Sequence, residues 1–304
     1  MAKRWKIKKS APTDVIDRLV KDVNVSPVIA NLLWDRGVNN FDEAKLFFRP
    51  ELEHLHDPFL MKDMDKAIAR IEKAISAGEK IMIYGDYDVD GTTSVALVYS
   101  FFKNLSPTIA SKLTQFSPLE GETGEELWSY YIPDRYKEGY GISNAGIDFA
   151  AENNITLIIA LDCGIKAVDK IDYANNKSID FIICDHHLPG NEIPNAIAVL
   201  DPKRKDCPYP YKELSGCGIG FKLIQAYSQK KNIPITALTQ YLDLTAVSIA
   251  SDIVPITGEN RILAYYGLER LNNDPRPGIK AMLEMTKIKR ELTITDIVFV
   301  IGPR

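Results

Sequence analysis

The sequence predicts an α/β fold in which a parallel β-sheet is sandwiched by helices, with a helical N-terminal appendage and a helical C-terminal connector. Short apolar runs at residues 81–84, 156–161 and 181–184 lack alternation, which is typical of strands covered on both faces. Each run ends in a cluster containing Asp or His, and helix-compatible segments lie between and after the runs. These two observations together indicate repeated strand-to-helix units.

Composition limits the class of protein. The 304 residues are 45% apolar and 26% charged, which excludes a disordered or collagen-like chain. No run approaches the ~20 apolar residues of a membrane span, so we expect a cytoplasmic protein that is not associated with a membrane. The formal charge of −4 argues against coating nucleic acid by bulk electrostatics. The four cysteines form no CxxC pair and are expected to be reduced thiols.

The first 60 residues predict a small helical extension. They mix charges and prolines with hydrophobic anchors at Trp34, Phe41, Phe47 and Phe48. The expected main domain follows over residues 61–250.

This domain is expected to begin with a helix whose apolar positions recur at helical spacing until Gly78, where a left-handed cap costs little. The first apolar run then leads through an aspartate-rich loop into a helix that reaches Phe102. Residues 104–127 carry Ser, Pro, Gly and Glu without a period, which predicts an inserted surface loop.

The C-terminal part is predicted to be mainly helical after Pro202. The expected helices cover 220–231, 235–250, 261–271 and 278–286. Residues 251–304 would form a helical connector, and because they stop after an apolar segment we expect them to continue into a longer protein.

Acidic and imidazole side chains follow the three predicted strands. They are Asp86, Asp88 and Asp90, then Asp162, then Asp185, His186 and His187. Because ligand sites in parallel sheets lie beyond the carboxyl ends of the strands, we expect these clusters to be neighbours. Crowded carboxylates favour a bound divalent cation, and mixed Asp/His ligation suits manganese better than calcium.

Two alternatives bear on this interpretation. A calcium loop would need Glu about six residues after Gly91, where the chain has Leu97, and Asp/Gly clusters also occur in ordinary turns.

Adjacent residues of an extended segment point to opposite sides, so of His186 and His187 we expect one to bind metal and the other to face substrate. Two ions sharing a carboxylate would activate a water for phosphodiester or phosphoanhydride hydrolysis.

Four blocks resemble the DHH phosphoesterase superfamily. They are Tyr-Gly-Asp-Tyr-Asp-Val-Asp-Gly at 84–91, Asp-Cys-Gly at 162–164, Asp-His-His at 185–187 and Ala-Ser-Asp-Ile-Val-Pro at 250–255. Within the superfamily the chain resembles the RecJ-like nucleases, through the segments 131–135, 138–141, 214–223 and 301–304. The resemblance covers residues 60–304.

The resemblance implies a metal centre with two divalent cations, Mn²⁺ or Mg²⁺. The implied ligands are Asp88, Asp90, Asp162, His186 and Asp252, with Asp162 as the bridge and Asp86 as a further ligand or supporting acid. His187 would contact the scissile phosphate, and Asp185 would orient a histidine through its ring N–H. Tyr84 stands where phosphatase relatives have a metal-binding histidine.

Candidate substrate contacts follow from the same resemblance. Arg135, Lys222 and Arg304 would bind phosphate, although salt bridges are an equal alternative for Arg135 and Lys222. The helix N-terminus at residues 215–220, with Ser215, Gly216 and Gly218, would offer backbone N–H groups to an anion.

The implied activity is that of a single-stranded-DNA-specific 5′ to 3′ exonuclease that releases mononucleotides in recombination and repair. Its partners would be single-stranded DNA and a single-strand-binding protein or helicase. RecJ-like enzymes continue into DHHA1 and OB-fold domains, so this part is expected to be weakly active by itself. The alternatives are a small-molecule phosphoesterase, acting on oligonucleotides, cyclic dinucleotides or pyrophosphate, and a catalytically silent scaffold.

Overall fold

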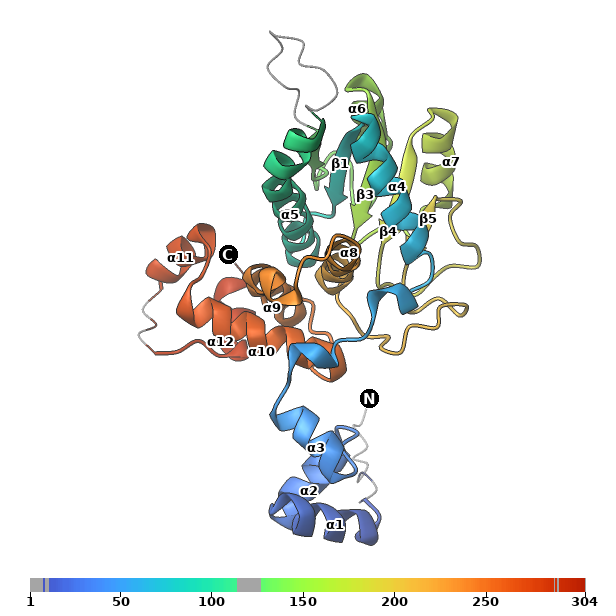
Figure 1. Ribbon diagram of the computed structural model, residues 1–304. Coiled ribbons are helices and arrows are strands. Elements are labelled where there is room, and N and C mark those ends of the chain that lie inside the picture. The colour runs from blue at the N-terminus through green and yellow to red at the C-terminus, as the bar shows by residue number, and fades with distance from the viewer. Residues whose placement is uncertain (1–7, 9–10, 114–126, 287, 289, 304) are drawn as a thin grey trace, which may run out of the picture. The chain divides into compact units, whose positions relative to one another are not determined.

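A computed structural model describes residues 8, 11–113, 127–286, 288 and 290–303, with the backbone alone over 106–113 (Figure 1). The chain divides into two compact units, Met1–Leu55 and His56–Arg304. The division falls five residues before the predicted end of the N-terminal extension.

The first unit is helical, as predicted. Its elements are α1 (Thr13–Val23), α2 (Pro27–Trp34), α3 (Phe41–Phe48) and the 3₁₀ turn η1 (Leu52–His54). Trp34 and Phe47 pack against its small core. Phe41 and Phe48 are 51% and 50% exposed, so the prediction that they anchor a core is wrong.

The second unit is built on a five-stranded parallel sheet. The spatial order is β2 (Trp128–Tyr131), β1 (Lys80–Gly85), β3 (Ile155–Leu161), β4 (Asp180–Cys184) and β5 (Ala198–Leu200). The three predicted strands are confirmed as β1, β3 and β4. The two edge strands were missed because they are too short to show a pattern.

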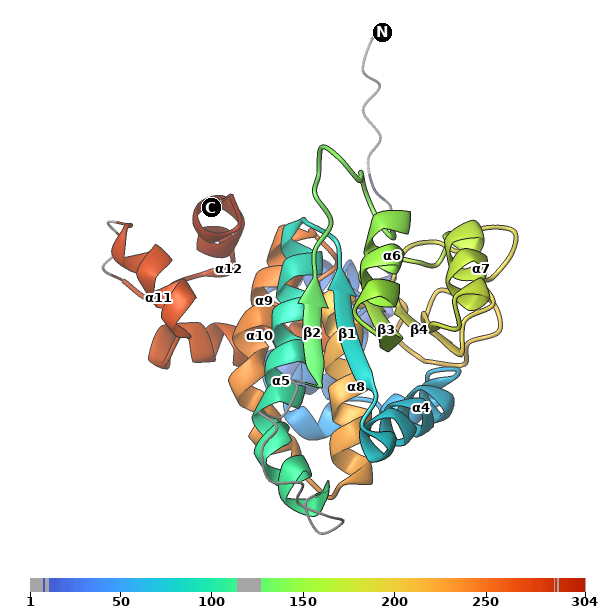
Figure 2. The ribbon, with the colours of Figure 1, turned by 90° about the horizontal axis from the view of Figure 1, so that it is seen from above.

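Helices cover both faces of the sheet. On one face α6 (Asn144–Glu152) and α7 (Val168–Asn176) share a core with Met82 and Tyr84 of β1. The other face is covered by α4 (Met64–Ala77), α5 (Val89–Leu113) and α8 (Gly216–Lys230) (Figure 2). Nearly every position of β1, β3 and β4 is therefore buried, as their continuous apolar runs predicted.

The predicted inserted loop is wrong over residues 104–113, which continue helix α5 to Leu113. Helix α5 as a whole packs against α8 and α9 (Leu242–Ser251), and it includes the Ser-Pro step at 106–107 that favoured a loop. Asn104 Nδ2 donates to the hydroxyl of Tyr241, the residue before α9, at 3.2 Å. Residues 114–126 lie outside the described part of the chain.

The remaining elements of the second unit are helical. They are η2 (Pro58–Leu60), η4 (Ile235–Tyr241), α10 (Gly258–Asn273), α11 (Pro277–Glu284), α12 (Ile294–Asp296) and η5 (Ile297–Ile301). The predicted helix 235–250 divides into η4 and α9. Ala246, Val247 and Ala250 of α9 share a core with Leu271 and Ile301, so the expected connector packs on the helix before it. A domain boundary at residue 250 stays a prediction.

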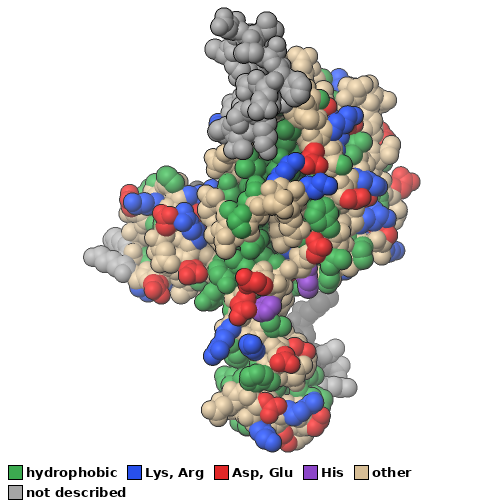
Figure 3. Space-filling view, in the orientation of Figure 1, with side chains coloured by type: hydrophobic (Ala, Val, Ile, Leu, Met, Phe, Trp, Pro, Cys, Tyr) green, Lys and Arg blue, Asp and Glu red, His purple; other side chains and the backbone are tan. Residues whose placement is uncertain are grey.

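The surface and the cysteines match the expectations from composition. Over the region of α4 and α7 in Figure 3, basic and acidic side chains are interspersed rather than segregated. All four cysteines are buried free thiols. Among the described residues, no helix combines the length and the apolar character that crossing a bilayer requires.

Candidate active site

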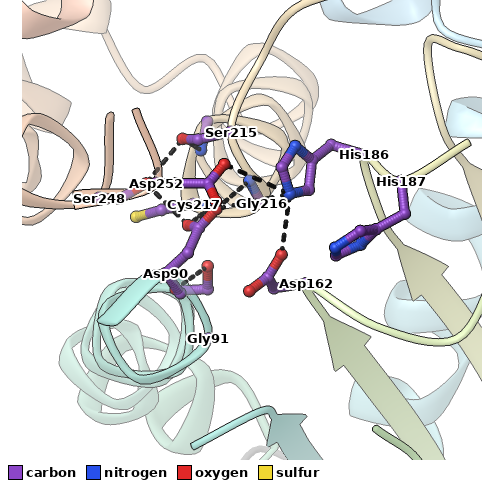
Figure 4. A network of polar contacts seen from close by, with 12 residues as sticks. Asp90, Gly91, Asp162, His186, His187, Ser215, Gly216, Cys217, Ser248 and Asp252 are labelled. Carbon is purple, nitrogen blue, oxygen red and sulfur yellow. Dashed lines mark hydrogen bonds and ion pairs between the residues drawn. The ribbon is translucent and has the colours of Figure 1, made fainter. Parts of the chain in front are cut away.

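The acidic and histidine clusters meet at the carboxyl edge of the sheet, as predicted. His186 lies at the centre: its Nε2 is 3.1 Å from Asp162 Oδ1, 3.6 Å from Asp252 Oδ2 and 3.8 Å from Asp90 Oδ2 (Figure 4). Asp162 follows β3, His186 follows β4, Asp90 lies in the first turn of α5, and Asp252 follows α9. Four segments distant in sequence thus contribute one group each.

Asp162 is held in an unusual backbone conformation. Its φ of 61° is in the left-handed region, where a non-glycine residue costs about 1–3 kcal/mol. The Asp162 N–H donates to Cys184 O at 2.8 Å, which extends the β3–β4 pairing by one residue before the chain turns. The turn brings the carboxylate to the N-terminus of α8. A Cβ on Gly216 would lie 2.6 Å from Asp162 Cβ, so this approach requires glycine.

The buried atoms of this cluster fit a divalent cation. Among the described residues, Asp162 Oδ1 and both ring nitrogens of His186 are buried and make no well-aligned hydrogen bond, although Nε2 and Oδ1 lie 3.1 Å apart. Unpaired buried polar atoms are costly and rare. Adjacent ligands of an ion with bonds near 2.1 Å lie about 3 Å apart, close to the distances around His186 Nε2. Asp162, His186 and His187 form one possible ligand group, and Asp90, His186 and Asp252 form another.

Electrostatics also favour a cation at this position. Burial, and then the charges of Asp90 and Asp88, raise the pKa of Asp162 to about 12. The same causes raise the pKa of Asp252 to about 6. Burial lowers the pKa of His186, which favours the neutral imidazole, and a neutral imidazole offers one ring nitrogen as a ligand. Without a bound cation, the ionised forms of Asp162 and Asp252 are therefore disfavoured.

Asp185 organises the loop that carries both histidines. Its Oδ1 accepts from His187 Nδ1 at 2.7 Å and from the backbone N–H of His186 at 2.7 Å, and its Oδ2 accepts from Ile165 N–H at 2.8 Å. The predicted orienting contact with a histidine ring is present in the structure, and it is made with His187. The hydrogen bond to Asp185 raises the pKa of His187, although burial opposes it.

The prediction that the two imidazoles point to opposite sides is wrong. The residues after β4 bend instead of staying extended, and the ring centroids of His186 and His187 lie 4.6 Å apart. Figure 4 shows both rings beside Asp162. His187 therefore lies close to the same cluster.

The first aspartates of the β1–α5 loop lie outside the two ligand groups. Asp88 is exposed, and its Oδ1 accepts from the Gly91 N–H at 2.9 Å. Asp86 is buried, which raises its pKa, and its Oδ2 has no partner among the described residues. Their roles as ligands stay predictions. Tyr84 is fully buried and its hydroxyl donates to Gly141 O at 2.9 Å, so it belongs to the core.

The prediction that Lys222 binds phosphate is corrected by its burial. Its side chain is 0% exposed, and its Nζ lies 2.5 Å from Glu259 Oε1. The Nζ also donates to His56 O at 2.9 Å and to Gln225 Oε1 at 2.8 Å. All of its hydrogen-bonding capacity is used within the protein, which is the salt-bridge alternative.

The predicted anion site at the N-terminus of α8 is likewise corrected. Gly216 N–H donates to Asp90 Oδ2 at 2.7 Å, and Cys217 N–H donates to Asp90 Oδ1 at 2.8 Å. Ser215 caps the helix by accepting from Gly218 N–H at 3.1 Å. Ser215, Gly216 and Gly218 are buried, so the anion at this helix end is the protein's own carboxylate.

Arg135 lies on the surface. Its guanidinium is 4.8 Å from the centroid of the Tyr87 ring, and Tyr140 makes edge contacts with both Tyr87 and His187. Tyr140 belongs to the Glu-Gly-Tyr-Gly segment but had no role in the sequence prediction. Arg304 lies outside the described residues.

Comparison with known proteins identifies the family. A model of the DHH family, N-terminal domain, matches residues 80–249, and the chain belongs to this family. It is similar to the single-stranded-DNA-specific exonuclease RecJ of Bacillus subtilis, with 38% identity over 283 residues, which cover 93% of this chain and 33% of that protein.

Solved structures agree in fold. RecJ from Thermus thermophilus with Mn²⁺ aligns with a TM-score of 0.76 at 24% identity, over 99% of this chain and 39% of that chain. The same protein with Mg²⁺ gives 0.64 at 23% identity, over 99% and 36%. A RecJ exonuclease bound to manganese gives 0.68 at 26% identity, over 83% and 58%. The chain thus spans a third to somewhat over half of these relatives.

Proposed function

We propose that the chain is the catalytic part of a metal-dependent, single-stranded-DNA-specific 5′ to 3′ exonuclease of recombination and repair. The observation that carries the proposal is the convergence of Asp90, Asp162 and Asp252 on His186 Nε2 within 3.1–3.8 Å. The likeness to RecJ supports the substrate class. A cytoplasmic location and a single-strand-binding protein or helicase as partner belong to the same proposal.

The metal centre would take two divalent cations, Mn²⁺ or Mg²⁺, the ions in the solved RecJ structures. When bound, such ions lower the pKa of a coordinated water and neutralise phosphoryl oxygens. Asp90, Asp162, His186 and Asp252 would hold them, with Asp162 as the bridge. Asp86 and Asp88 would complete the coordination from the β1–α5 loop.

His187 would stabilise the reacting phosphate. Its Nδ1–H is engaged by Asp185, which directs the remaining ring nitrogen, Nε2, toward a ligand. Asp185 raises the pKa of His187, so the imidazolium form persists to higher pH than in a free histidine, and in this form Nε2–H would donate to a phosphate oxygen. Hydrogen bonds to developing charge typically contribute about 10²–10³ in rate.

A chain of contacting side chains that leads from His187 through Tyr140 and Tyr87 to Arg135 would bind the strand. Arg135 offers a guanidinium to phosphate, and the rings of Tyr87 and Tyr140 offer surfaces on which bases stack. Stacking of this kind tolerates any sequence and needs unpaired bases, which agrees with a single-strand-specific, sequence-independent activity.

The test is release of mononucleotides from 5′-labelled single-stranded and duplex DNA with Mn²⁺, using the chain, Asp162→Ala and a form extended beyond Arg304. We expect single-strand-selective release that Asp162→Ala abolishes and that the extension increases. Hydrolysis of a dinucleotide or pyrophosphate without release from DNA would identify a small-molecule phosphoesterase instead. Inactivity of every form on every substrate would indicate a scaffold.

A further inference from the structure

Ser248, on the buried helix α9, contacts the candidate ligand Asp90. Its Oγ donates to Asp90 Oδ1 at 2.7 Å and lies 2.6 Å from Ser215 Oγ. Both serines are 0% exposed. Burying a hydroxyl on a mostly apolar helix costs free energy unless the hydroxyl is hydrogen-bonded. The hydrogen bond to Asp90 offsets this cost for Ser248.

The hydrogen bonds of Asp90 leave it with one open position. Oδ1 accepts from Cys217 N–H and from Ser248, and Oδ2 accepts from Gly216 N–H. A carboxylate has about four lone-pair sites, so a single one remains, on Oδ2. Oδ2 is also the oxygen 3.8 Å from His186 Nε2, on the side of the cluster (Figure 4).

The proton of Ser248 has a determined place when Asp90 is ionised. The carboxylate has no proton, so without the Ser248 proton two sets of lone pairs would face each other at 2.7 Å. Ser215 Oγ already accepts from Gly218 N–H and keeps its own proton for the 2.6 Å contact between the serines. The two hydroxyls thereby connect the N-cap of α8 to Asp90.

We propose that Ser248 is a positioning residue of the metal centre, whose hydroxyl acts with the N–H groups of Gly216 and Cys217 to fix the rotation of the Asp90 carboxylate. With Ser248 in place, the open lone pair of Oδ2 stays directed toward His186. Without it, Oδ1 keeps a single backbone hydrogen bond and the carboxylate rotates more freely about χ2. The inference rests on the proposed metal-dependent function, and it adds a residue that touches neither substrate nor metal.

The experiment is titration of the metal-free chain with Mn²⁺, monitored by the EPR signal of the free ion, without DNA. We expect Ser248→Ala to weaken Mn²⁺ binding about 10- to 100-fold, as removal of groups that orient ligands does elsewhere. The matched control is Ser228→Ala, because Ser228 is also a buried helical serine and its Oγ has no partner among the described residues. This control should bind Mn²⁺ as the parent does.

A second readout separates positioning from a general structural defect. The Mn²⁺ concentration for half-maximal DNA hydrolysis should rise in Ser248→Ala, while the rate at saturating Mn²⁺ recovers, because Asp90 itself is intact. An unchanged Mn²⁺ affinity would overturn the inference, and so would a rate lowered equally at every Mn²⁺ concentration. If Ser248→Ala does not fold, Ser248→Cys replaces it, with a smaller weakening expected and unchanged binding contradicting the proposal.

The same measurements distinguish this inference from the proposed function. Weakened Mn²⁺ binding in Ser248→Ala, together with no DNA hydrolysis either by the chain or by the form extended beyond Arg304, would support the role of Ser248 and overturn the proposed substrate. Absence of Mn²⁺ binding by the parent chain would overturn both.

Discussion

The Asp162 side chain lies directly against the α-carbon of Gly216. A Cβ at position 216 would be 2.6 Å from Asp162 Cβ and 2.7 Å from its Oδ1. Two segments more than fifty residues apart therefore meet at a distance that only glycine permits, and one of them carries the candidate bridging ligand.

Gly216→Ala should displace Asp162 and lower the nuclease rate at least about 10²-fold, because misplacement of a reacting group by ~1 Å has an effect of this size. Gly278→Ala is the matched control, since a Cβ there meets nothing within 4 Å. Steady-state rates at saturating Mn²⁺, with circular dichroism to verify folding, measure the effect. Equal rates in the two variants would contradict the close approach.

Asp162→Asn should stabilise the metal-free protein and remove its stabilisation by Mn²⁺. The pKa of Asp162 is about 12 in the folded protein, against an ordinary value of 3.8. Between these values the folded state keeps a proton that the unfolded chain releases, so the free energy of unfolding of the metal-free chain falls as pH rises. The variant should lose this slope.

Thermal unfolding in EDTA and in Mn²⁺, between pH 5 and 8, provides the measurement for Asp162→Asn. Asp172→Asn, at an exposed helical position of α7, is the control and should follow the parent under both conditions. A parent chain whose stability in EDTA does not fall with pH would count against the raised pKa.

Asp185→Asn should move the alkaline limit of the rate to lower pH. The hydrogen bond from His187 to Asp185 raises the pKa of His187, so the imidazolium persists to higher pH and is lost as the pH passes that value. Without the carboxylate, the imidazolium is lost at lower pH.

His187→Ala should remove the alkaline limit of the rate altogether and lower the rate about 10²–10³-fold. His54→Ala, in the first unit, should leave the pH profile unchanged.

Lys222→Met should destabilise the fold rather than weaken DNA binding. It leaves Glu259 buried and uncompensated apart from hydrogen bonds from Tyr209 and the His56 N–H, and breaking such a pair costs about 3–5 kcal/mol. Lys231→Met, which breaks a more exposed pair with Glu72, should cost about 0–1 kcal/mol. Urea denaturation compares the two.

An unchanged urea midpoint for Lys222→Met, together with a raised KM for single-stranded DNA, would contradict the structural role of the Lys222–Glu259 pair and would identify Lys222 as a phosphate contact.

The central strands and most of the candidate metal ligands could be predicted from sequence alone. The runs at 81–84, 156–161 and 181–184 are buried on both faces, so their composition reports their environment directly. The ends of parallel strands share one edge, and this was sufficient to bring Asp162 and His186 together with Asp90.

Tertiary structure decided the roles of the groups around these ligands. Lys222 and the N–H groups of Gly216 and Cys217 have the chemistry of a phosphate site, and only their burial and their actual partners, Glu259 and Asp90, assign them to the protein itself. The position of Ser248 against Asp90 depends on how α9 packs on α5 and α8. A strand pattern is local and can be read from composition, whereas the partner of a polar group is set by elements distant in sequence that packing brings together.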